Sequence, residues 1–452
     1  MIIDLSTPDT SVSVRQISTK SLGDHSYIVE VGGEAVAIDI QRDLDRFESV
    51  LDGVDADLVA VFETHIHNDY VSGGKRLAGA HDATYVLPAN TGATYEHTPL
   101  PDGETIPVGG WTMRAMHTPG HTHNHTSYVL ESPDGPVAIF TGGSMLVGAV
   151  GRSDLLGPDQ TEQLLFDQYA SAHRIADTLP DPSIVAPTHG AGSFCSASAV
   201  ADTTSTVERE KMQNPALLAP SAENFAASQV LGYKQYPIYY KHMAPSNLLP
   251  LGAPPGGDLP VITDLTDAGS ATIVDVRPFL EYAAGHIPGS IGIPASTDDA
   301  VYMGWTLDWN SPVALVGTEA DVAEVRLHLA RIGWDEILGR IEPEVLQDLV
   351  DGPLATTPYV TFEEVNGSDM NVLDVRDPVE HLTGVIPGAD LIHLADMARN
   401  PGPYAKDQVT VHCRSGYRAG IAAGFLEAQG SAVTVVYDSL SNYAGSLTAP
   451  TK

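Results

Sequence analysis

The chain has 452 residues, 43% of them hydrophobic, which is enough for two or three packed domains. Its 58 Asp and Glu against 23 Lys and Arg give a net charge of −35, so neither nucleic acid nor an anionic membrane is expected as a partner. Two Cys argue against a disulfide framework, and we find neither a signal peptide nor an apolar run of roughly 18 residues, so we expect a cytoplasmic protein.

The first 245 residues, which we expect to form one domain, alternate short β-rich runs with turns. These runs predict strands at 27–31, 35–38, 58–62, 84–87, 112–116, 127–130 and 137–140. Helical patterns occur near 41–52, 159–179 and 201–212. The stretch 246–259, rich in Pro and Gly, is predicted to be a linker to the rest of the chain.

Three predicted strands in this domain are followed by loops that carry histidine. One loop runs from Thr64 to Tyr70, a second from His117 to His125, and a third begins after the apolar residues 184–186. A lone His is usually a surface or core residue, but three such loops are typical of a metal site. We expect one divalent metal, and the candidate ligands are His65, His67, Asp69, His121 and His189.

Other polar residues near these loops are expected to have lesser roles. His123 and His125 are more typical of surface residues or of an outer layer around a metal than of ligands. Ser144 could bond a metal-bound water. Cys195 lies six residues beyond His189 and is expected to be a small structural residue.

These segments resemble the metallo-β-lactamase fold over residues of about 1–240. The motifs are Thr-His-x-His-x-Asp at 64–69, Thr-Pro-Gly-His at 118–121, Phe-Thr-Gly-Gly at 140–143 and Gly-Arg-Ser-Asp at 151–154. The last two, with Glu208-Arg209 and Asn214-Pro215, look most like the persulfide dioxygenase branch, near the glyoxalase II branch. The resemblance implies an αββα sandwich and, in the dioxygenase branch, iron held by two His and one carboxylate.

Two positions depart from the family, because Tyr70 stands where a further His is usual and Gly143 where an Asp ligand is usual. Three outcomes stay open. His67 could join His65 and His121 in a three-imidazole set that suits zinc as well as iron, Asp69 could supply the carboxylate, or the site could bind metal weakly. A Gly143→Asp substitution is expected to restore the ligand and tighten iron binding.

After the linker, the sequence of one small domain occurs twice. Asp-Val-Arg at 275–277, Glu281, Gly285 and Ile-Pro-Gly at 287–289 all recur 99 residues later (374 minus 275). A gap-free repeat of this length indicates two copies of one domain rather than a solenoid. Each copy alternates strands with helices, which predicts two small, doubly wound α/β domains at 260–352 and 353–452.

Cys413 lies in the second copy, between the apolar strand 409–412 and a helical stretch rich in Ala and Gly. A thiol at this turn faces the N–H groups and the positive end of the helix, and Arg414 and Arg418 add positive charge. Each influence favours the thiolate, so Cys413 is predicted to be a nucleophile.

The first copy differs where this chemistry would occur. Gly317 replaces the nucleophile, and the acidic residues Glu319 and Asp321 replace the arginines. We therefore expect the first copy to lack Cys chemistry and to serve as a scaffold or interface.

The two copies resemble the rhodanese family of sulfurtransferases over residues of about 258–450. The resemblance rests on Asp-Val-Arg, Gly-x-Ile-Pro-Gly and the Cys-Arg-x-Gly-x-Arg loop. It implies that Cys413 accepts a sulfane sulfur as a persulfide, and that Arg414 and Arg418 position an anionic donor. A Cys-dependent phosphatase needs five residues between Cys and Arg, but only four lie between Cys413 and Arg418, so the ring suits one sulfur better than a phosphate.

The whole chain thus resembles a fusion of a persulfide dioxygenase with rhodanese domains. The leading hypothesis is an enzyme of sulfur metabolism that oxidises or transfers the sulfane sulfur of low-molecular-weight thiol persulfides. Fe(II) is the favoured metal and zinc is possible, and the expected partners are a small thiol or persulfide, sulfite or thiosulfate, and a possible second copy of the chain. Two alternatives stay open: a sulfur-binding scaffold that feeds the rhodanese domain, and a glyoxalase II-like thioester hydrolase.

Overall fold

The computed structural model describes residues 1–7, 10–196, 201–249 and 252–450. These form two compact units, one of Met1–Pro254 with Arg331–Gly333 and one of Pro255–Ala330 with Trp334–Lys452. The expected domain boundaries at 245, 259 and 352 stay predictions, and residues 250–251 of the expected linker lie outside the described residues.

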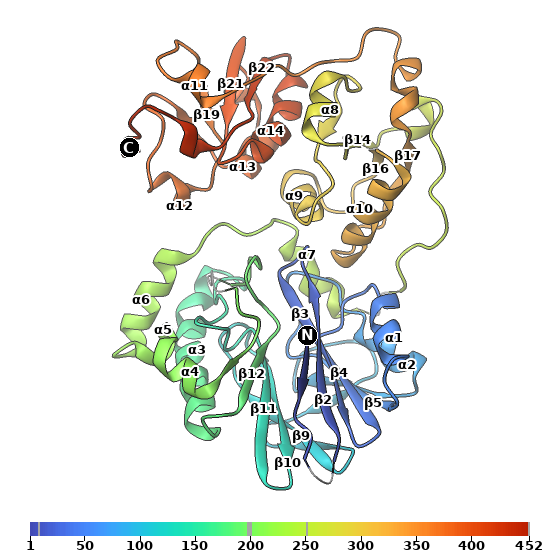
Figure 1. The fold of residues 1–452 in the computed structure, drawn as a ribbon, viewed down its shortest axis with the longest axis vertical. Helices are drawn as coiled ribbons and strands as arrows, with labels where there is room; N and C mark the ends of the chain where they lie inside the picture. Colours follow the sequence, from blue (N-terminus) through green and yellow to red (C-terminus); the bar gives the residue numbers. More distant parts are fainter. Residues whose placement is uncertain (8–9, 197–200, 250–251, 451–452) are drawn as a thin grey trace. The chain divides into compact units, whose positions relative to one another are not determined.

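Two sheets form the centre of the first unit (Figure 1). The first sheet has the order β1-β2-β3-β4-β5-β6-β7 and comprises β1 (Ile2–Asp4), β2 (Val12–Thr19), β3 (Asp24–Val31), β4 (Glu34–Ile38), β5 (Asp57–Phe62), β6 (Thr84–Pro88) and β7 (Thr98–Leu100). The second has the order β13-β12-β11-β10-β9-β8 and comprises β8 (Thr105–Val108), β9 (Trp111–His117), β10 (Thr126–Ser132), β11 (Gly135–Gly142), β12 (Ile184–Pro187) and β13 (Ser205–Thr206).

Helices cover the outer faces of both sheets. Apolar side chains of α1 (Asp45–Leu51) and α2 (Gly74–Ala80) pack on the first sheet. Those of α3 (Pro158–Thr178), α4 (Val207–Gln213) and α5 (Pro215–Leu218) belong to the apolar cluster on the second sheet, α6 (Ala222–Gly232) packs on α3, and α7 (Tyr240–Asn247) follows. This is the αββα sandwich that the sequence predicted.

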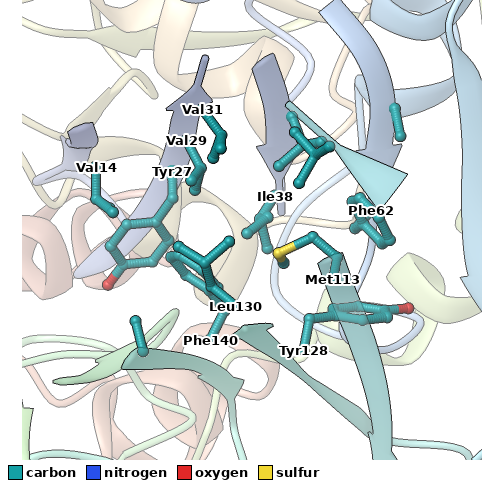
Figure 2. Close-up of a cluster of buried hydrophobic side chains, with 14 of the residues drawn as sticks. Val14, Tyr27, Val29, Val31, Ile38, Phe62, Met113, Tyr128, Leu130 and Phe140 are labelled. Atoms are coloured by element: carbon teal, nitrogen blue, oxygen red, sulfur yellow. The ribbon is translucent and has the colours of Figure 1, made fainter. Parts of the chain in front are cut away.

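The core of the sandwich lies between the facing sheets (Figure 2). Alternate residues of β2 are buried, as expected for a strand with one face on a core. The rings of Tyr27 and Phe140 pack 5.1 Å apart, and those of Phe62 and Tyr128 pack 4.8 Å apart. Burial of each such side chain contributes about 1.5–3 kcal/mol, so this core holds the strand ends, and the loops that follow them, in fixed positions.

The second unit contains two parallel sheets, one for each copy of the repeat. The first copy comprises η1 (Leu265–Ala268), β14 (Thr272–Asp275), α8 (Phe279–Ala284), β15 (Ile291–Gly292), α9 (Asp299–Thr306), β16 (Val313–Val316), α10 (Glu319–Arg331), β17 (Ile337–Ile341) and η2 (Pro343–Leu349). Its sheet has the order β15-β14-β16-β17.

The second copy has a five-stranded parallel sheet in the order β18-β22-β21-β19-β20. Its elements are β18 (Tyr359–Val360), α11 (Phe362–Val365), β19 (Val372–Asp374), α12 (Pro378–His381), β20 (Asp390–Leu391), α13 (Leu394–Arg399), η3 (Gly402–Tyr404), β21 (Gln408–His412), α14 (Tyr417–Glu427), β22 (Ala432–Val436) and η4 (Leu440–Asn442). Both copies thus have the doubly wound α/β form that the repeat predicted.

The repeated Asp-Val-Arg motif has a structural role. In the second copy, Arg376 donates to both carboxylate oxygens of Asp374 and, at 2.8 Å, to the carbonyl of Gly384. Arg277 makes the same contacts with Asp275 and Gly285 in the first copy. A buried bidentate pair of this kind ties β14 in the first copy and β19 in the second to the Gly-x-Ile-Pro-Gly turn, which explains why both motifs recur.

The seven strands predicted in the first unit are all present, with ends shifted by a few residues. The predicted helix at 201–212 is wrong in its first half, because Ser205 and Thr206 pair with β12 as strand β13 and the helix begins at Val207. Among the residues described, no helix combines the length and apolarity that a membrane crossing requires.

Candidate functional site

The three histidine loops meet at one point in the first unit. His65 follows β5, His121 follows β9 and His189 follows β12, and all three side chains are fully buried. One ring nitrogen of each lies within 4.8 Å of the others. The Nε2 atoms of all three have no hydrogen-bond partner among the described residues, although buried polar groups nearly always have one. Three converging lone pairs of this kind fit a metal ion.

A hydrogen-bond chain fixes the tautomer of His65. Its Nδ1 lies 2.9 Å from the hydroxyl of Thr64, which donates to Asp39 at 2.8 Å. Because the Thr64 proton goes to the carboxylate, Nδ1–H of His65 is the donor to Thr64, and Nε2 keeps the lone pair. An outer layer of this kind is usual around metal-binding imidazoles.

The other two imidazoles are oriented in the same way. Nδ1 of His121 donates to the carbonyl of Arg152 at 2.7 Å, and Nδ1 of His189 donates to Asp24 at 2.9 Å. Arg152 itself is held by Asp154 and by the carbonyls of Phe194 and Lys234. Each Nε2 therefore presents a lone pair at the meeting point.

Burial keeps these three imidazoles neutral. It lowers the pKa of His65 well below the ordinary value, lowers the pKa of His121 to about 3 and lowers that of His189, and neighbouring imidazoles add to the effect. A metal ligand must be unprotonated, so the charge state of the three groups suits a cation.

His67 has a different environment. Its Nε2 lies 3.2 Å from Asp39, 3.1 Å from Glu63 and 2.9 Å from the hydroxyl of Tyr70. Burial lowers its pKa, but the two carboxylates outweigh burial and raise the pKa to about 10. The two carboxylates therefore favour the charged form of His67. Its ring packs 4.1 Å from that of His65, but its Nε2 faces Asp39, Glu63 and Tyr70 and does not converge with the Nε2 atoms of His65 and His121.

Asp69 lies at the side of the three imidazoles. Neither of its buried oxygens has a hydrogen-bond partner among the described residues, and one lies 3.3 Å from Nδ1 of His189. Burial and the nearby Asp24 raise its pKa. Ligand atoms of His67, Asp69 and His189 also lie within 4.8 Å of one another, so Asp69 could add a carboxylate from this side.

The ring of His121 fills the space where a carboxylate at position 143 would be. A Cβ atom on Gly143 would lie 2.3 Å from Cδ2 and 2.9 Å from Nε2 of His121. The expectation that Gly143→Asp simply restores a ligand is therefore wrong, because the imidazole would have to move first.

The remaining residues that the sequence singled out lie around this centre. His125 is buried, and its Nε2 accepts from the N–H of Gly143 at 2.9 Å, whereas His123 is exposed. Ser144 is buried without a hydrogen-bond partner for its hydroxyl among the described residues, and Cys195 is fully buried. The carboxylates of Asp24 and Asp39 were missed, although Asp39 directly follows the apolar strand β4, the same signal that identified the His loops.

Cys413 lies between β21 and α14, as the sequence predicted. The residue is 1% exposed, and its Sγ accepts from the N–H of Gly416 at 3.1 Å. Gly416 has a φ of +98°, and a Cβ there would lie 3.0 Å from Cα of Tyr437, so glycine is required at this turn. The sulfur thus faces the amide end of α14, where negative charge is stabilised.

The two arginines of this loop lie in different surroundings. Arg418 forms a bidentate pair with Glu380, at 2.5 and 3.0 Å, and this pair raises the pKa of Arg418 although burial lowers it. Arg414 has an exposed side chain. Of the two, Arg414 is therefore the more available to an incoming anion.

The first copy of the repeat supports this loop but does not reproduce it. The hydroxyl of Tyr417 lies 2.9 Å from Ser296 Oγ and donates to the carbonyl of Pro294 at 2.9 Å. A Cβ atom on Gly317 would lie 2.7 Å from a methyl group of Val276. The first copy therefore has little room for a nucleophile at Gly317 and contacts the loop of the second copy.

Comparison with known proteins separates the two repeated domains from the first unit in the same way. The family model described as Rhodanese-like domain matches residues 261–338 and 362–449. A metallo-β-lactamase from Staphylococcus aureus subsp. aureus COL is 29% identical with a TM-score of 0.67, covering 73% of this chain and 98% of its own. ETHE1 from Myxococcus xanthus is 27% identical with a TM-score of 0.45, covering 52% of this chain and 97% of its own.

Among curated proteins, an atrochrysone carboxyl ACP thioesterase of Aspergillus fumigatus is 33% identical over 134 residues, which is 27% of this chain and 30% of the thioesterase. A thioesterase of the same name from Emericella nidulans is 30% identical over 145 residues, which is 44% of its length. The chain thus spans less than half of the curated relatives it matches. The fold, the site and the family match together show that this chain combines a metallo-β-lactamase fold with two rhodanese-like domains.

Proposed function

We propose that the chain is an enzyme of sulfane-sulfur metabolism in which Cys413 carries the sulfur. The observation that carries this proposal is the position of Cys413 Sγ, which accepts an N–H at the start of α14 in a loop too short to surround a phosphate. A persulfide places its negative charge on the outer sulfur, and this loop offers amide groups and Arg414 to that charge.

The transfer step needs no cofactor. The thiolate of Cys413 attacks the outer sulfur of a donor such as thiosulfate, a new S–S bond forms, and sulfite leaves with the electron pair of the broken S–S bond. An acceptor thiolate then attacks the outer sulfur and takes it as its own persulfide, which returns Cys413 as thiolate. Small thiols, persulfides, sulfite and thiosulfate are therefore the proposed partners, in the cytoplasm.

For the first unit we propose one divalent metal held by His65, His121 and His189, with Asp69 beside it. Fe(II) would supply the redox chemistry that lets dioxygen oxidise a thiol persulfide, and the overall reaction consumes one dioxygen and one water to give thiol and sulfite. Around the metal, Asp24 and the Thr64–Asp39 pair orient the imidazoles, and burial excludes water.

A thioester hydrolase is the second candidate for the first unit. Two observations favour it: three neutral imidazoles without a carboxylate from position 143 suit zinc as well as iron, and several of the curated relatives are named as thioesterases. Zinc would supply a metal-bound hydroxide for attack on a carbonyl.

One experiment separates these candidates. Full-length protein is reconstituted with Fe(II) or with Zn(II), and dioxygen uptake on glutathione persulfide is compared with hydrolysis of an acyl-glutathione thioester. We expect uptake with iron, abolished by His65→Ala and kept by His123→Ala, because the His123 side chain is exposed. Thioester hydrolysis without dioxygen uptake would assign the hydrolase instead. If the protein shows neither activity, the sulfur-binding scaffold is favoured.

A parallel measurement tests the sulfur carrier. After exposure to thiosulfate, mass spectrometry is expected to show one added sulfur on the peptide that contains Cys413, and none in Cys413→Ser. Full sulfurtransferase activity of Cys413→Ser would contradict the assignment.

A further inference from the structure

A cavity of about 220 Å³ lies in the first unit between α2, the segment at Tyr95 and the end of α7. Two cationic side chains line it, Lys75 and Arg76, together with Ser72, Tyr85, Tyr95 and Asn247. None of these residues belongs to the three-imidazole centre or to the Cys413 loop. A cavity with two cations is unusual in a chain with a net charge of −35.

Neither cation has a carboxylate partner in the described part of the chain. The ammonium of Lys75 donates to the carbonyl of Glu96 at 2.7 Å and lies 5.0 Å from the centre of the Tyr95 ring. Arg76 donates to the carbonyl of Arg42 at 3.3 Å. Carbonyls and a ring face orient these groups but do not neutralise them, so the two charges remain available to an anion.

The surroundings of Arg76 disfavour its charged form when no anion is bound. Burial and the neighbouring Arg42 lower the pKa of Arg76, and Asp45 opposes them only in part. An anion bound beside Arg76 in the cavity would favour the charged form of this guanidinium.

The carboxylate of Glu63 lies behind the wall of the cavity. One of its oxygens accepts from Ser72 and from Tyr85, the latter at 3.2 Å, and the other lies 3.1 Å from Nε2 of His67. Both oxygens are therefore engaged by other side chains, and among the described residues neither forms an ion pair with Lys75 or Arg76.

The size of the cavity limits the ligand. Sites for drug-sized molecules occupy about 300–1,000 Å³, so this smaller volume suits a small ion. An Arg fork and a Lys ammonium that line one cavity with polar side chains offer several donors to the oxygens of one anion. We propose that the cavity binds a small tetrahedral oxyanion, such as sulfate, thiosulfate or phosphate, through Lys75 and Arg76.

The wall of the cavity also supports the metal loop. Asn247 donates to the carbonyls of His67 and Tyr70 at 3.0 and 2.8 Å, and it accepts from the N–H of Ser72 at 2.9 Å. An oxyanion in the cavity therefore lies one layer of hydrogen bonds away from the loop that carries His65.

Isothermal titration of the full-length protein with sulfate, thiosulfate and phosphate, at constant ionic strength, tests this site. Sulfate has no sulfane sulfur to give to Cys413, so it separates the cavity from the sulfur-transfer loop. We expect saturable binding of at least one of the three anions, weakened by about tenfold or more in Lys75→Gln/Arg76→Gln. Hydrogen exchange is expected to slow in α2 when the anion binds.

The matched control is Arg209→Gln/Lys211→Gln on α4, which removes the same charge from exposed ion pairs with Asp202 and Asp181 in the same unit. It is expected to bind as the parent does, and circular dichroism verifies that both variants are folded. Absence of saturable binding, or equal affinity of the parent and Lys75→Gln/Arg76→Gln, would overturn the proposal.

Discussion

The imidazole of His121 lies against the backbone of Gly143, so closely that a Cβ atom at position 143 would come within 2.3 Å of its ring. Nδ1 of the same imidazole is bonded to the carbonyl of Arg152, which prevents the ring from turning away freely. The absence of a carboxylate at position 143 and the position of His121 are therefore linked, because glycine, the smallest residue, leaves room for the ring.

This contact predicts that Gly143→Asp weakens metal binding. Overpacking of a buried site costs about 1–3 kcal/mol, and the displaced ring is one of the three proposed ligands. We expect a lower melting temperature and less bound metal per chain, measured by calorimetry and by elemental analysis. Gly79→Asp is the control, because a Cβ at Gly79 meets nothing within 4 Å. Tighter iron binding by Gly143→Asp would show that a carboxylate can replace the ring.

A second prediction concerns the third ligand. His189→Ala is expected to lose the metal as completely as His65→Ala, because the Nε2 atoms of both lie at the meeting point. Asp24→Asn, which weakens the bond that orients His189, is expected to reduce affinity by about 10- to 100-fold. Cobalt(II) titration followed by its visible spectrum reports both effects.

The control for the metal-ligand variants is His123→Ala, because the exposed His123 bonds only to Gln160 among the described residues. The same metal content in the parent and in His65→Ala/His121→Ala would show that the metal is not bound at the proposed site.

The sequence predicted the strands and the His loops because both depend on local patterns. The strand at 58–62 and the loop that begins at Thr64 follow from a run of buried residues that ends in polar ones. The environment of His67 could not be predicted, because it depends on Asp39, which is 28 residues away and lies at the end of a neighbouring strand. Whether a histidine binds metal or a carboxylate depends on such distant contacts.

Distant contacts in the loop that carries Cys413 could not be predicted either. The position of Cys413 between strand and helix follows from the local sequence, but the pairing of Arg418 with Glu380 joins residues 38 positions apart. The repeat contained a signal for it, since Glu281 and Glu380 are matched positions, but the first copy has no arginine to reveal the partner.

The Arg418–Glu380 pair predicts opposite effects for its two members. Arg418→Ala leaves the carboxylate of Glu380 unpaired and removes a positive charge that acts on Cys413, so sulfur transfer is expected to fall by roughly tenfold to hundredfold. Glu380→Gln keeps the shape and frees Arg418 for an anionic donor, so the KM for thiosulfate is expected to fall. Steady-state kinetics with thiosulfate measures both, and Glu319→Ala in the first copy is the control. Unchanged transfer by Arg418→Ala would assign the pair to stability alone.

The first copy of the repeat is expected to lack sulfurtransferase activity even when a Cys is introduced at position 317. Gly317→Cys introduces a side chain that would meet Val276 at 2.7 Å, and its loop carries Glu319 rather than an arginine. In a Cys413→Ser background, we therefore expect no recovery of sulfurtransferase activity and no added sulfur by mass spectrometry. Recovery of activity would mean that the first copy lacks only its nucleophile.

His393 predicts how the stability of the second unit depends on pH. This buried imidazole caps α13, because its Nδ1 accepts from the N–H of Ala395, and its ring packs 4.4 Å from that of Trp305. Burial lowers its pKa from 6.5 to about 4. The charged groups that also act on it are Asp377, Asp396, Arg418 and Arg399.

Because the pKa of His393 is lower in the folded chain, the unfolded chain binds more protons between about pH 4 and 6.5, so acid favours unfolding. The free energy of unfolding is not reduced by this group above pH 6.5. It falls by up to about 3 kcal/mol as the pH falls towards 4. His393→Asn keeps an acceptor at the cap and removes the titration, so its stability is expected to fall less over this range. Urea unfolding followed by tryptophan fluorescence at several pH values tests this, and parallel pH profiles for the parent and His393→Asn would contradict it.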